Sequence, residues 1–370
     1  MTSGDDTRVF ALVTGGGTGG HVYPALAVAE ELVRRGHPRA EIEFVGSARG
    51  LESTVVPAAG FVIELLPGRG IRRSFAPSAL RANLGALIGA VRAFGRAFRM
   101  VGRVRPRVVF GVGGYASLPC IVAARLRRVP AVVHEQNAAP GLSNRIGVRM
   151  GARAAVSLPG TPLRGAVVTG NPVRPSMVSV QRVPSTPPMV TVFGGSLGAA
   201  RLNDAALDLY ERWRGRADVV IRHISGRRDH DRCRARLDGV QRPGDVLRYE
   251  LVPYEEHMEH VYRDSALVAC RSGAVTVAEL AATGTPAVLV PLPGAPGDHQ
   301  TRNAEALVDA GAAVLVDDAA LDGARLAKEI EALLADPAAL ASMGDAARGL
   351  ARVDAASRVA DLVEEAARAA

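Results

Sequence analysis

The sequence predicts an α/β protein made of two doubly wound, Rossmann-like domains. Its 370 residues suit two domains of roughly 150 to 200 residues each. Short apolar runs alternate with segments of helical periodicity, which is typical of parallel sheets covered by helices on both faces. Each half also opens with a strand, a glycine-rich turn and a helix. Two such domains are expected to face a central cleft, because ligands of open α/β sheets bind outside the carboxyl ends of the strands.

In the first half, an apolar run at residues 8–14 ends in a glycine-rich turn at 15–20. A helical pattern through Arg35 follows, with Pro24 in its first turn, where the missing N–H does no harm. A long helical pattern spans residues 78–103. Further buried strands are expected at 42–45, 108–112, 131–134 and 154–157.

The second half repeats the pattern, with a strand at 189–193, a glycine-rich turn at 194–198 and a helix at 199–212. Between the halves, residues 171–175 and 183–188 are rich in proline, and we interpret this region as the linker between the domains. Further buried strands are expected at 219–223, 267–270, 287–290 and 313–316.

The net charge of +8 hides an asymmetry between the halves. Up to residue 182 the chain has 24 arginines and 9 acidic residues, a net charge of +15. The remainder has 21 basic and 28 acidic residues, a net charge of −7. A one-sided positive field attracts substrate phosphates, nucleic acid or anionic lipid headgroups.

The composition limits the environments in which this chain can work. Cys120, Cys233 and Cys270 are odd in number and have no metal-ligand spacing, so we expect reduced thiols. Residues 1–8 include two aspartates and no apolar stretch, which argues against a secretory signal. No window of about 18 residues is uncharged and apolar throughout. Any membrane contact is therefore expected to be peripheral.

The first glycine-rich turn has the spacing of a dinucleotide-binding fingerprint at Gly15, Gly17 and Gly20. That fingerprint also requires an acid at the end of the second strand to bind ribose, and here the strand ends in Val-Gly-Ser. The turn lacks the Gly-Lys-Ser/Thr of a P-loop as well. It allows a ligand to approach the backbone closely at a helix N-terminus, beside Thr18 and His21.

His21 is the strongest single candidate for catalysis. It lies at the end of a strand, where α/β folds bind their ligands. A helix N-terminus favours the neutral form of an imidazole, which can accept a proton. The alternative is a packed or solvated histidine, the commoner role of a lone histidine.

Two further polar loops follow strands of the first half. Residues 111–115 form another glycine-rich turn that ends in Tyr115, and residues 134–137 read His-Glu-Gln-Asn. Alone, the second loop is also typical of an ordinary strand-to-helix connection in which Glu135 forms an isolated ion pair. Because the carboxyl ends of parallel strands meet at one edge of a sheet, we expect these loops to form a sugar or acceptor site.

The second half contains two helix starts that suit phosphate. The turn at 194–198 presents backbone amides and the Ser196 hydroxyl, and residues 271–276 form a similar helix start. Glu279 lies three residues after Thr276, where its carboxylate can accept hydrogen bonds from both hydroxyls of a ribose. A capping box made by Thr276 and Glu279 is the alternative interpretation.

Taken together, these segments resemble glycosyltransferase family 28. The resemblance implies a GT-B enzyme that transfers N-acetylglucosamine from UDP-N-acetylglucosamine (UDP-GlcNAc) to lipid I, undecaprenyl-pyrophosphoryl-MurNAc-pentapeptide, to give lipid II in peptidoglycan synthesis. The matching segments follow the family's order. They are residues 15–24, 111–115, 134–137, 170–174, 194–199, 270–276 with Glu279, and His299-Gln300 with Asn303.

The resemblance implies that residues 1–173, joined by a last helix within 351–370, bind the acceptor and the membrane. Residues 174–350 are then expected to bind the UDP-sugar. His21 is implied as the catalytic base and Glu135 as a second catalytic residue. The implied substrate-binding residues are Thr18, Gly19 and Gly20 beside donor and acceptor, Tyr115 in the acceptor half, Asn137 and Gln300 on the transferred sugar, Arg174 on the nucleotide, Ser196, Ala274, Val275 and Thr276 on the diphosphate, and Glu279 on the ribose.

One loop departs from the family's pattern. The family tends to have an apolar residue before Met258, whereas residues 254–257 read Tyr-Glu-Glu-His. We assign no uracil contact in this loop.

The expected reaction is an in-line displacement with inversion, in which a base takes the proton of the acceptor's hydroxyl and UDP leaves. Two helix N-termini and Arg174 are expected to stabilise the leaving charge without a metal or cofactor. The only Asp-x-Asp triplet, Asp229-His230-Asp231, lies among arginines, and we interpret it as a solvated helix face.

The segment 78–103 is the best candidate for contact with an anionic membrane surface on the cytoplasmic side. An ordinary helix packed on its own sheet is the alternative. Its apolar face consists of Leu80, Leu84, Leu87, Ile88, Val91, Phe94 and Phe98, and its flank of Arg81, Arg92, Arg96, Arg99 and Arg103.

Three rival functions remain open at this point. An NAD-dependent oxidoreductase lacks the acid after the second strand and leaves the second-half loops unexplained. A non-catalytic protein that binds nucleotide or nucleic acid rests on the basic half. Aromatic residues make up only 4% of the chain and offer few platforms for stacking bases, so nucleic acid is not an expected partner. A paralogous UDP-sugar transferase could use another acceptor on the same loops.

Overall fold

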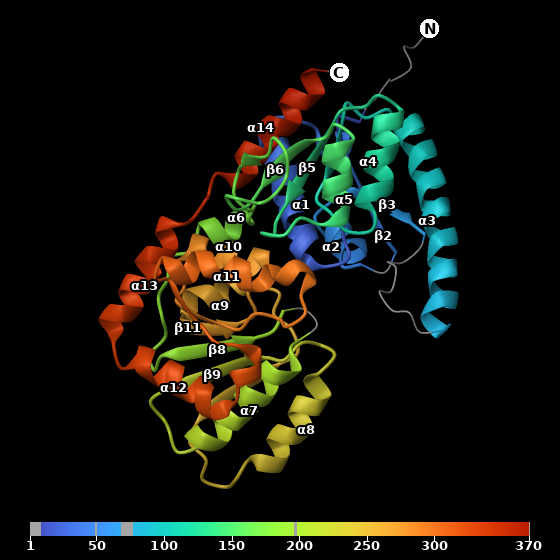
Figure 1. Cartoon of the computed structure of the whole chain (residues 1–370). Helices are drawn as coiled ribbons and strands as arrows, with labels where there is room; N and C mark the ends of the chain where they lie inside the picture. The colour runs from blue at the N-terminus through green and yellow to red at the C-terminus, as the bar shows by residue number, and fades with distance from the viewer. Residues whose placement is uncertain (1–8, 49, 68–76, 196–197, 370) are drawn as a thin grey trace. The chain divides into compact units, whose positions relative to one another are not determined.

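The computed structural model describes residues 9–48, 50–67, 77–195 and 198–369, with the side chains of 77–88 left out. The contacts divide the chain into two compact units (Figure 1). Unit 1 comprises Met1–Arg174 with Val353–Ala370, and unit 2 comprises Pro175–Arg352. Each unit has its own parallel sheet with helices on both faces, so the predicted fold class is confirmed.

Unit 1 contains a seven-stranded sheet in the order β3-β2-β1-β4-β5-β6-β7, and every described pairing is parallel. The strand order reverses between β1 and β4. The loops that follow these two strands therefore lie at the switch point where doubly wound sheets bind ligands. The strands are β1 (Ala11–Thr14), β2 (Ile42–Ser47), β3 (Val62–Leu66), β4 (Val108–Gly111), β5 (Ala131–Glu135), β6 (Arg153–Val156) and β7 (Val167–Val168).

Two sets of helices cover the faces of this sheet, as the right-handed crossover rule requires for strands that run out in both directions. The first set shares one apolar core and consists of α1 (Gly19–Arg34), α2 (Glu52–Ala58) and α14 (Ala355–Arg368). The second packs on the other face and consists of α3 (Pro77–Val104), α4 (Ser117–Leu126) and α5 (Leu142–Arg149). A short 3-10 helix, Arg39–Glu41, precedes β2.

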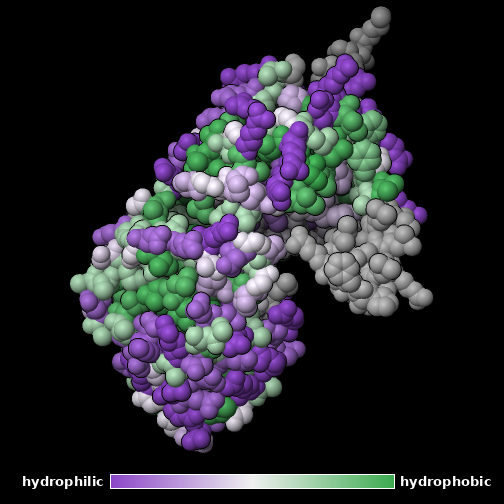
Figure 2. Space-filling model, viewed as in Figure 1, coloured by the Kyte–Doolittle hydropathy of each residue, from purple (hydrophilic) through white to green (hydrophobic). Residues whose placement is uncertain are grey.

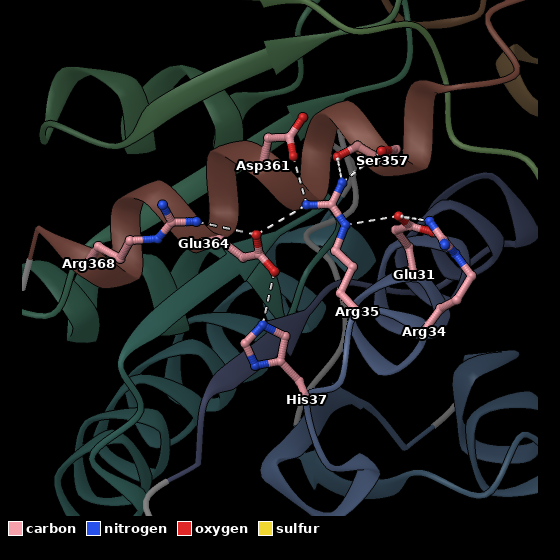
Figure 3. A network of polar contacts seen from close by, with 8 residues as sticks. All are labelled: Glu31, Arg34, Arg35, His37, Ser357, Asp361, Glu364 and Arg368. Carbon is pink, nitrogen blue, oxygen red and sulfur yellow. Dashed lines mark hydrogen bonds and ion pairs between the residues drawn. The ribbon is translucent and has the colours of Figure 1, made fainter.

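The last helix, α14, belongs to unit 1, where it packs on α1 through buried apolar residues that include Val359 and Val363. A polar network centred on Arg35 borders this contact (Figure 3). The Arg35 guanidinium donates to Glu31 at 2.9 Å, to Asp361 at 2.7 Å and to Glu364 at 3.1 Å. It also donates to the carbonyl and hydroxyl oxygens of Ser357, at 2.8 and 2.7 Å. His37 approaches Glu364 at 3.0 Å.

Unit 2 contains a six-stranded parallel sheet in the order β10-β9-β8-β11-β12-β13. Its order reverses between β8 and β11, so the loops after these strands hold the same position as those after β1 and β4 in unit 1. The strands are β8 (Met189–Phe193), β9 (Val220–Ile224), β10 (Arg248–Val252), β11 (Ser265–Cys270), β12 (Ala287–Leu289) and β13 (Ala313–Leu315).

The helices of unit 2 again lie on two faces. Those that share the apolar core of one face are α7 (Ala200–Trp213), α8 (His230–Val240) and α12 (Gly323–Leu334). Those that contact α10 are α6 (Pro175–Val178), α9 (Met258–Asp264), α11 (His299–Asp309) and α13 (Pro337–Gly349), with α10 itself spanning Ala274–Thr283. Two short 3-10 helices, Pro296–Asp298 and Asp318–Ala320, complete the unit.

The proline-rich segment after Arg174 is anchored on unit 2. Arg182 donates to the carbonyl oxygens of Gly284 at 3.0 Å, Ser265 at 2.9 Å and Ala266 at 2.8 Å. Burial lowers the pKa of Arg182 to about 10. The bonds to three carbonyls compensate the burial of this cation.

The long helix α3 has a core face that differs from the stripe expected from the sequence. Ala93, Ala97, Met100 and Val101 are buried against the sheet, whereas Val91 of the expected stripe is 65% exposed. The interpretation that this stripe belongs wholly to the core is therefore wrong at Val91. The expected positions 80, 84, 87 and 88 lie outside the described side chains.

Two of the flanking arginines of α3 are held by one carboxylate. Arg96 and Arg103 bind Glu64 of β3 at 2.8 and 2.7 Å. Within the described ranges, no helix is both long and apolar enough to cross a bilayer.

The Asp-x-Asp triplet lies on an ion-paired surface around α7 and α8, where hydrophilic residues dominate in Figure 2. Arg232 and Arg236 pair with Asp204 and Asp208 of α7. Asp229 accepts hydrogen bonds from Asn203 at 3.3 Å and from Arg228 at 3.0 Å. In the part of the chain that is described, no three His, Cys, Asp or Glu side chains are grouped to hold a metal.

The three cysteines are free and buried in separate places of the fold. Burial raises the pKa of the Cys120 thiol to about 12 and also raises the pKa of Cys233 and Cys270. Thiols with raised pKa values are poor nucleophiles, so these cysteines are packing residues.

Candidate active site

The glycine-rich turn after β1 packs directly on the turn after β4. Gly114 has a φ of +83°, which an L side chain rarely adopts. A Cβ at Gly114 would overlap with the carbonyl oxygen of Gly16. The glycines of these two loops therefore permit contact between bare backbones at the switch point of the sheet.

Thr18 and His21 lie at the start of α1, beside this contact. Thr18 precedes the helix in an extended conformation, and its Oγ1 lies 3.4 Å from His21 Nδ1. A Cβ built on Gly113 would lie 3.2 Å from His21 Nε2, so the imidazole faces the bare backbone after β4. Gly19 and Gly20 form the first turn of the helix and are half-buried. The structure thus brings the predicted base to the predicted loops.

Glu135 ends β5 and is 3% exposed. One carboxylate oxygen accepts from the backbone and side-chain nitrogens of Asn137, at 3.1 and 3.4 Å. The other accepts from Gly141 N at 2.9 Å and Asn144 Nδ2 at 2.8 Å. The ion pair considered from the sequence does not form among the described residues. The carboxylate instead holds the loop that carries Asn137.

His134 and Gln136 form a buried support beneath the same loop. His134 Nε2 lies 3.0 Å from the carbonyl oxygen of Gly170, and its Nδ1 lies 3.1 Å from Gln136 Nε2. Gln136 Nε2 also lies 3.0 Å from the carbonyl oxygen of Val112, in the loop after β4. Burial lowers the pKa of His134 to about 4, so the ring is neutral at pH 7. The neutral ring donates through Nε2 and accepts through Nδ1.

Two further predicted residues of unit 1 lie on its loops. The Tyr115 hydroxyl donates to the carbonyl oxygen of Pro67 at 3.2 Å, and burial raises the pKa of Tyr115. The guanidinium carbon of Arg174 lies 4.6 Å from the ring centroid of Tyr23, in the first turns of α1. A cation stacked on an aromatic face keeps its orientation. Arg174 is thereby tied to the helix that begins beside Thr18.

In unit 2, α10 starts at Ala274, directly after Gly273. Its internal hydrogen bonds begin with Val277 N to Gly273 O at 2.9 Å, so the amides of Ala274, Val275 and Thr276 have no partner within the helix. Three amides at a helix N-terminus suit the oxygens of a diphosphate.

The alternative of a capping box at Thr276 and Glu279 is wrong. Thr276 lies inside the first turn, and the residue in the capping position is Gly273, which makes no side-chain cap. Glu279 lies one turn further on and is 6% exposed, with its Oε2 accepting from the Tyr262 hydroxyl at 3.0 Å. The bond to Tyr262 orients the carboxylate proposed for ribose.

Gln300 lies in the first turn of α11, next to the start of α10. Its Oε1 accepts from Leu292 N at 2.9 Å, and its carbonyl oxygen accepts from the Ser272 hydroxyl at 2.8 Å. Asn303 Nδ2 donates to Ser272 O at 3.3 Å. Arg271, 8% exposed, pairs with Asp318 at 2.7 Å. These bonds join the starts of α10 and α11 into one polar group.

The turn after β8 contains Ser196, which lies outside the described residues. The C-terminal end of this turn, at Gly198, packs closely on the carbonyl oxygen of Ser225, since a Cβ at Gly198 would overlap with that oxygen. Asn203 Nδ2 donates to that same oxygen at 2.9 Å, and Asn203 Oδ1 lies 2.9 Å from His223 Nε2. Burial lowers the pKa of His223 to about 3, so this ring is also neutral.

Several residues that shape these loops were not found from the sequence. Glu52 accepts from the amides of Gly17 and Ser47, both at 2.8 Å, while Tyr262 and Asn144 orient the two predicted carboxylates. Each lies on a helix, and the separation in sequence is 35 residues between Glu52 and Gly17, 17 between Tyr262 and Glu279, and 9 between Asn144 and Glu135.

Comparison with known proteins matches both units to one family. Residues 11–156 match the glycosyltransferase family 28 N-terminal domain, and residues 189–364 match the glycosyltransferase family 28 C-terminal domain. A relative from Alkalilimnicola ehrlichii is 44% identical over 96% of this chain and 99% of its own length. One from Desulforudis audaxviator is 39% identical over 96% and 97%. Both are named UDP-N-acetylglucosamine--N-acetylmuramyl-(pentapeptide) pyrophosphoryl-undecaprenol N-acetylglucosamine transferase.

Solved structures agree with this match. The crystal structure of Acinetobacter baumannii MurG has a TM-score of 0.74 and 29% sequence identity, covering 96% of this chain and 99% of that one. The glycotransferase of kitacinnamycin has a TM-score of 0.70 at 17% identity, covering 97% and 99%, which shows a shared fold alone.

Proposed function

Because the chain belongs to glycosyltransferase family 28, we propose that it transfers N-acetylglucosamine from UDP-GlcNAc to lipid I, giving lipid II in peptidoglycan synthesis. It is a hexosyltransferase. The observation that carries this assignment is the near full-length identity, 39–44%, to relatives named for this reaction. A dinucleotide-dependent oxidoreductase would also need an acid after β2, which ends in Ser47.

The donor is assigned to unit 2. In this assignment the amides of Ala274, Val275 and Thr276 bind the diphosphate, which their position at the start of α10 supports. Glu279 binds the ribose, and its hydrogen bond from Tyr262 supports a fixed orientation of the carboxylate. Ser196 joins the diphosphate site in this assignment, and Gln300 takes the transferred sugar. Each helix start contributes roughly 0.3 to 1 kcal/mol, or up to about 2 where partly buried, to stabilising the charge on the departing UDP. Arg174 supplies a further positive charge for the nucleotide.

The base is assigned to unit 1. A neutral His21 removes the proton of the acceptor's sugar hydroxyl as that oxygen attacks the anomeric carbon, and UDP leaves with inversion. Thr18 orients the ring in this assignment, which is supported by the 3.4 Å between its Oγ1 and His21 Nδ1, while Nε2 faces the backbone after β4. Gly19 and Gly20 add no side chains of their own at the start of this helix.

Glu135 takes a positioning role in this scheme. Its two oxygens are occupied by Asn137, Gly141 and Asn144, which supports the fixing of Asn137 against the sugar rather than a second proton transfer. Tyr115 is assigned to the acceptor. No metal or cofactor is required, because helix N-termini and Arg174 balance the leaving charge.

We further propose that the protein works as a peripheral protein on the cytoplasmic side of the cell membrane, where its lipid-linked acceptor lies. The basic first half and the exposed Val91 of α3 support contact with an anionic surface.

The reaction is tested by incubating the purified protein with radiolabelled UDP-GlcNAc and a lipid I analogue. We expect one labelled lipid product, none when the acceptor lacks its free sugar hydroxyl, and none with radiolabelled UDP-glucose. Label that enters another acceptor in preference would indicate a paralogous activity. Absence of any transfer, with UDP bound in calorimetry, would favour a non-catalytic nucleotide-binding protein.

A further inference from the structure

Glu52 is a buried carboxylate for which the proposed transfer has no assigned use. It is the first residue of α2 and is 2% exposed. Burying an ionised group is costly unless hydrogen bonds compensate it. Its position therefore has to be explained by what it holds.

The carboxylate joins the loops that follow two neighbouring strands. Glu52 Oε2 accepts from the amide of Gly17 at 2.8 Å, in the turn after β1. Glu52 Oε1 accepts from the amide of Ser47 at 2.8 Å, at the end of β2. Charge-assisted bonds of this length are roughly twice as strong as neutral ones. The turn after β1 is thus tied to its sheet through one side chain.

Bare backbone makes room for this side chain. A Cβ at Gly16, Gly46 or Gly50 would overlap with Glu52. Gly16 also has a φ of +146°, which favours glycine. Part of the glycine content of the turn therefore serves the internal carboxylate, and the Gly17 amide points to Glu52.

We propose that Glu52 is a positioning residue for glycosyl transfer. It fixes Gly17 and so the adjacent Thr18, from which α1 begins and against which the His21 ring lies. This inference rests on the proposed function, because the catalytic role of His21 gives the turn its importance. A misplacement of about 1 Å can lower a rate by about 10²-fold.

The test compares Glu52→Gln with Glu30→Gln, a control on α1 whose carboxylate pairs with Arg39 and is 36% exposed. The amide side chain keeps the size of Glu52 but has one acceptor oxygen, and its NH2 group opposes the second backbone amide. We expect kcat to fall about 10- to 100-fold, with an unchanged KM for UDP-GlcNAc and unchanged UDP affinity. Glu30→Gln is expected to have the same kcat as the unmodified protein.

Hydrogen exchange gives a readout that does not depend on activity. The peptide spanning residues 15–20 is expected to exchange faster in Glu52→Gln, while peptides of α10 and α14 keep their rates. Glu52→Asp keeps the charge but is one methylene shorter, so its kcat and its exchange at residues 15–20 are expected to lie between those of the unmodified protein and Glu52→Gln. It replaces Glu52→Gln in the test if that variant does not fold. The inference is overturned if folded Glu52→Gln has the kcat of the unmodified protein, or if its exchange at residues 15–20 is unchanged. If the unmodified protein transfers no sugar, the proposed function fails, and exchange still decides whether Glu52 holds the turn.

Discussion

Single buried polar residues hold the loops at the carboxyl ends of both sheets. Glu135 accepts hydrogen bonds from three donors of the loop after β5 and from Asn144 of α5, and Asn203 bridges His223 and the loop that contacts Gly198. A buried group that loses its partner costs about 1–3 kcal/mol, so such bonds fix a loop in one arrangement. The loops at the carboxyl end of each sheet are thereby held by side chains of their own unit.

Replacing His21 with alanine is expected to lower kcat about 10²- to 10⁴-fold, because the variant loses the positioned base. UDP affinity, measured by calorimetry, is expected to stay unchanged, since the donor is assigned to unit 2. His37→Ala is the control, because that histidine stacks on Phe10 and contacts Glu364 of α14. Turnover of His21→Ala equal to that of the control would reject His21 as the base.

The buried histidines predict a loss of stability in mild acid. Burial lowers the pKa of His134 from 6.5 to about 4, whereas the unfolded chain has the ordinary value. Between these two pH values the unfolded state binds more protons, so stability is full above about pH 6.5 and falls as the pH drops towards 4. At about 1.4 kcal/mol per pH unit, the total loss for this group is about 3 kcal/mol.

Urea unfolding of the chain at pH 7 and pH 5 measures this effect. The pH dependence is expected to be smaller for unit 1 in His134→Gln, which has no imidazole to protonate. His223, with a pKa lowered to about 3 by burial, acts in the same direction in unit 2. An equal pH dependence of unit 1 with and without His134 would contradict the assignment.

At the scale of elements, α14 completes unit 1 although the 178 residues of the other unit, Pro175–Arg352, precede it in the chain. Arg35→Ala is expected to destabilise this unit by about 1–3 kcal/mol, because Glu31, Asp361, Glu364 and Ser357 all lose a donor.

Arg34→Ala is the matched control, since Arg34 is the neighbour of Arg35 in sequence, contacts only Glu31 among the described residues and is 71% exposed. Thermal unfolding of both variants provides the comparison, and we expect no measurable change for the control. Equal effects of the two substitutions would show that the network does not tie α14 to α1.

The exposed part of α3 allows the membrane proposal to be tested. Val91→Glu is expected to weaken binding to anionic vesicles about fivefold or more, because it adds a charge near the surface that the lipid headgroups repel. Val183→Glu in unit 2 is the control, where the replaced valine is 67% exposed.

Sedimentation with anionic and neutral vesicles measures the binding. Equally weak sedimentation of the unmodified protein with both kinds of vesicle would defeat the proposal. Equal losses for both variants would place the contact away from α3.

At the scale of the whole molecule, the charge asymmetry agrees with the proposed assignment of the acceptor to unit 1 and the donor to unit 2. The stretch from residue 65 to 203 contains one acid, Glu135, and its carboxylate is buried in its own loop. The acidic second half pairs many of its carboxylates with arginines, as at Arg236 with Asp208. Unit 1 therefore has the stronger positive field towards phosphates and lipid headgroups.

The sequence alone determined the sheet centres and the loops that follow them. Ten strands were predicted: nine are central parallel strands, which are apolar on both faces, and the tenth is the apolar edge strand β13. The strands β3, β7 and β10 were missed. All three lie at sheet edges, where one side meets solvent and charges such as Arg248 are tolerated. The candidate loops could also be identified from the sequence, because glycine-rich turns and helix starts are encoded by a few neighbouring residues.

Only the tertiary structure decided which side chains hold those loops. The bonds of Glu52 to Gly17, of Tyr262 to Glu279 and of Arg35 to α14 connect residues that no local pattern links. The core face of α3 was also settled by packing, because its helical periodicity allows more than one apolar stripe. Periodicity and turn chemistry act over a few residues, whereas contacts between distant segments exist only once the chain has folded.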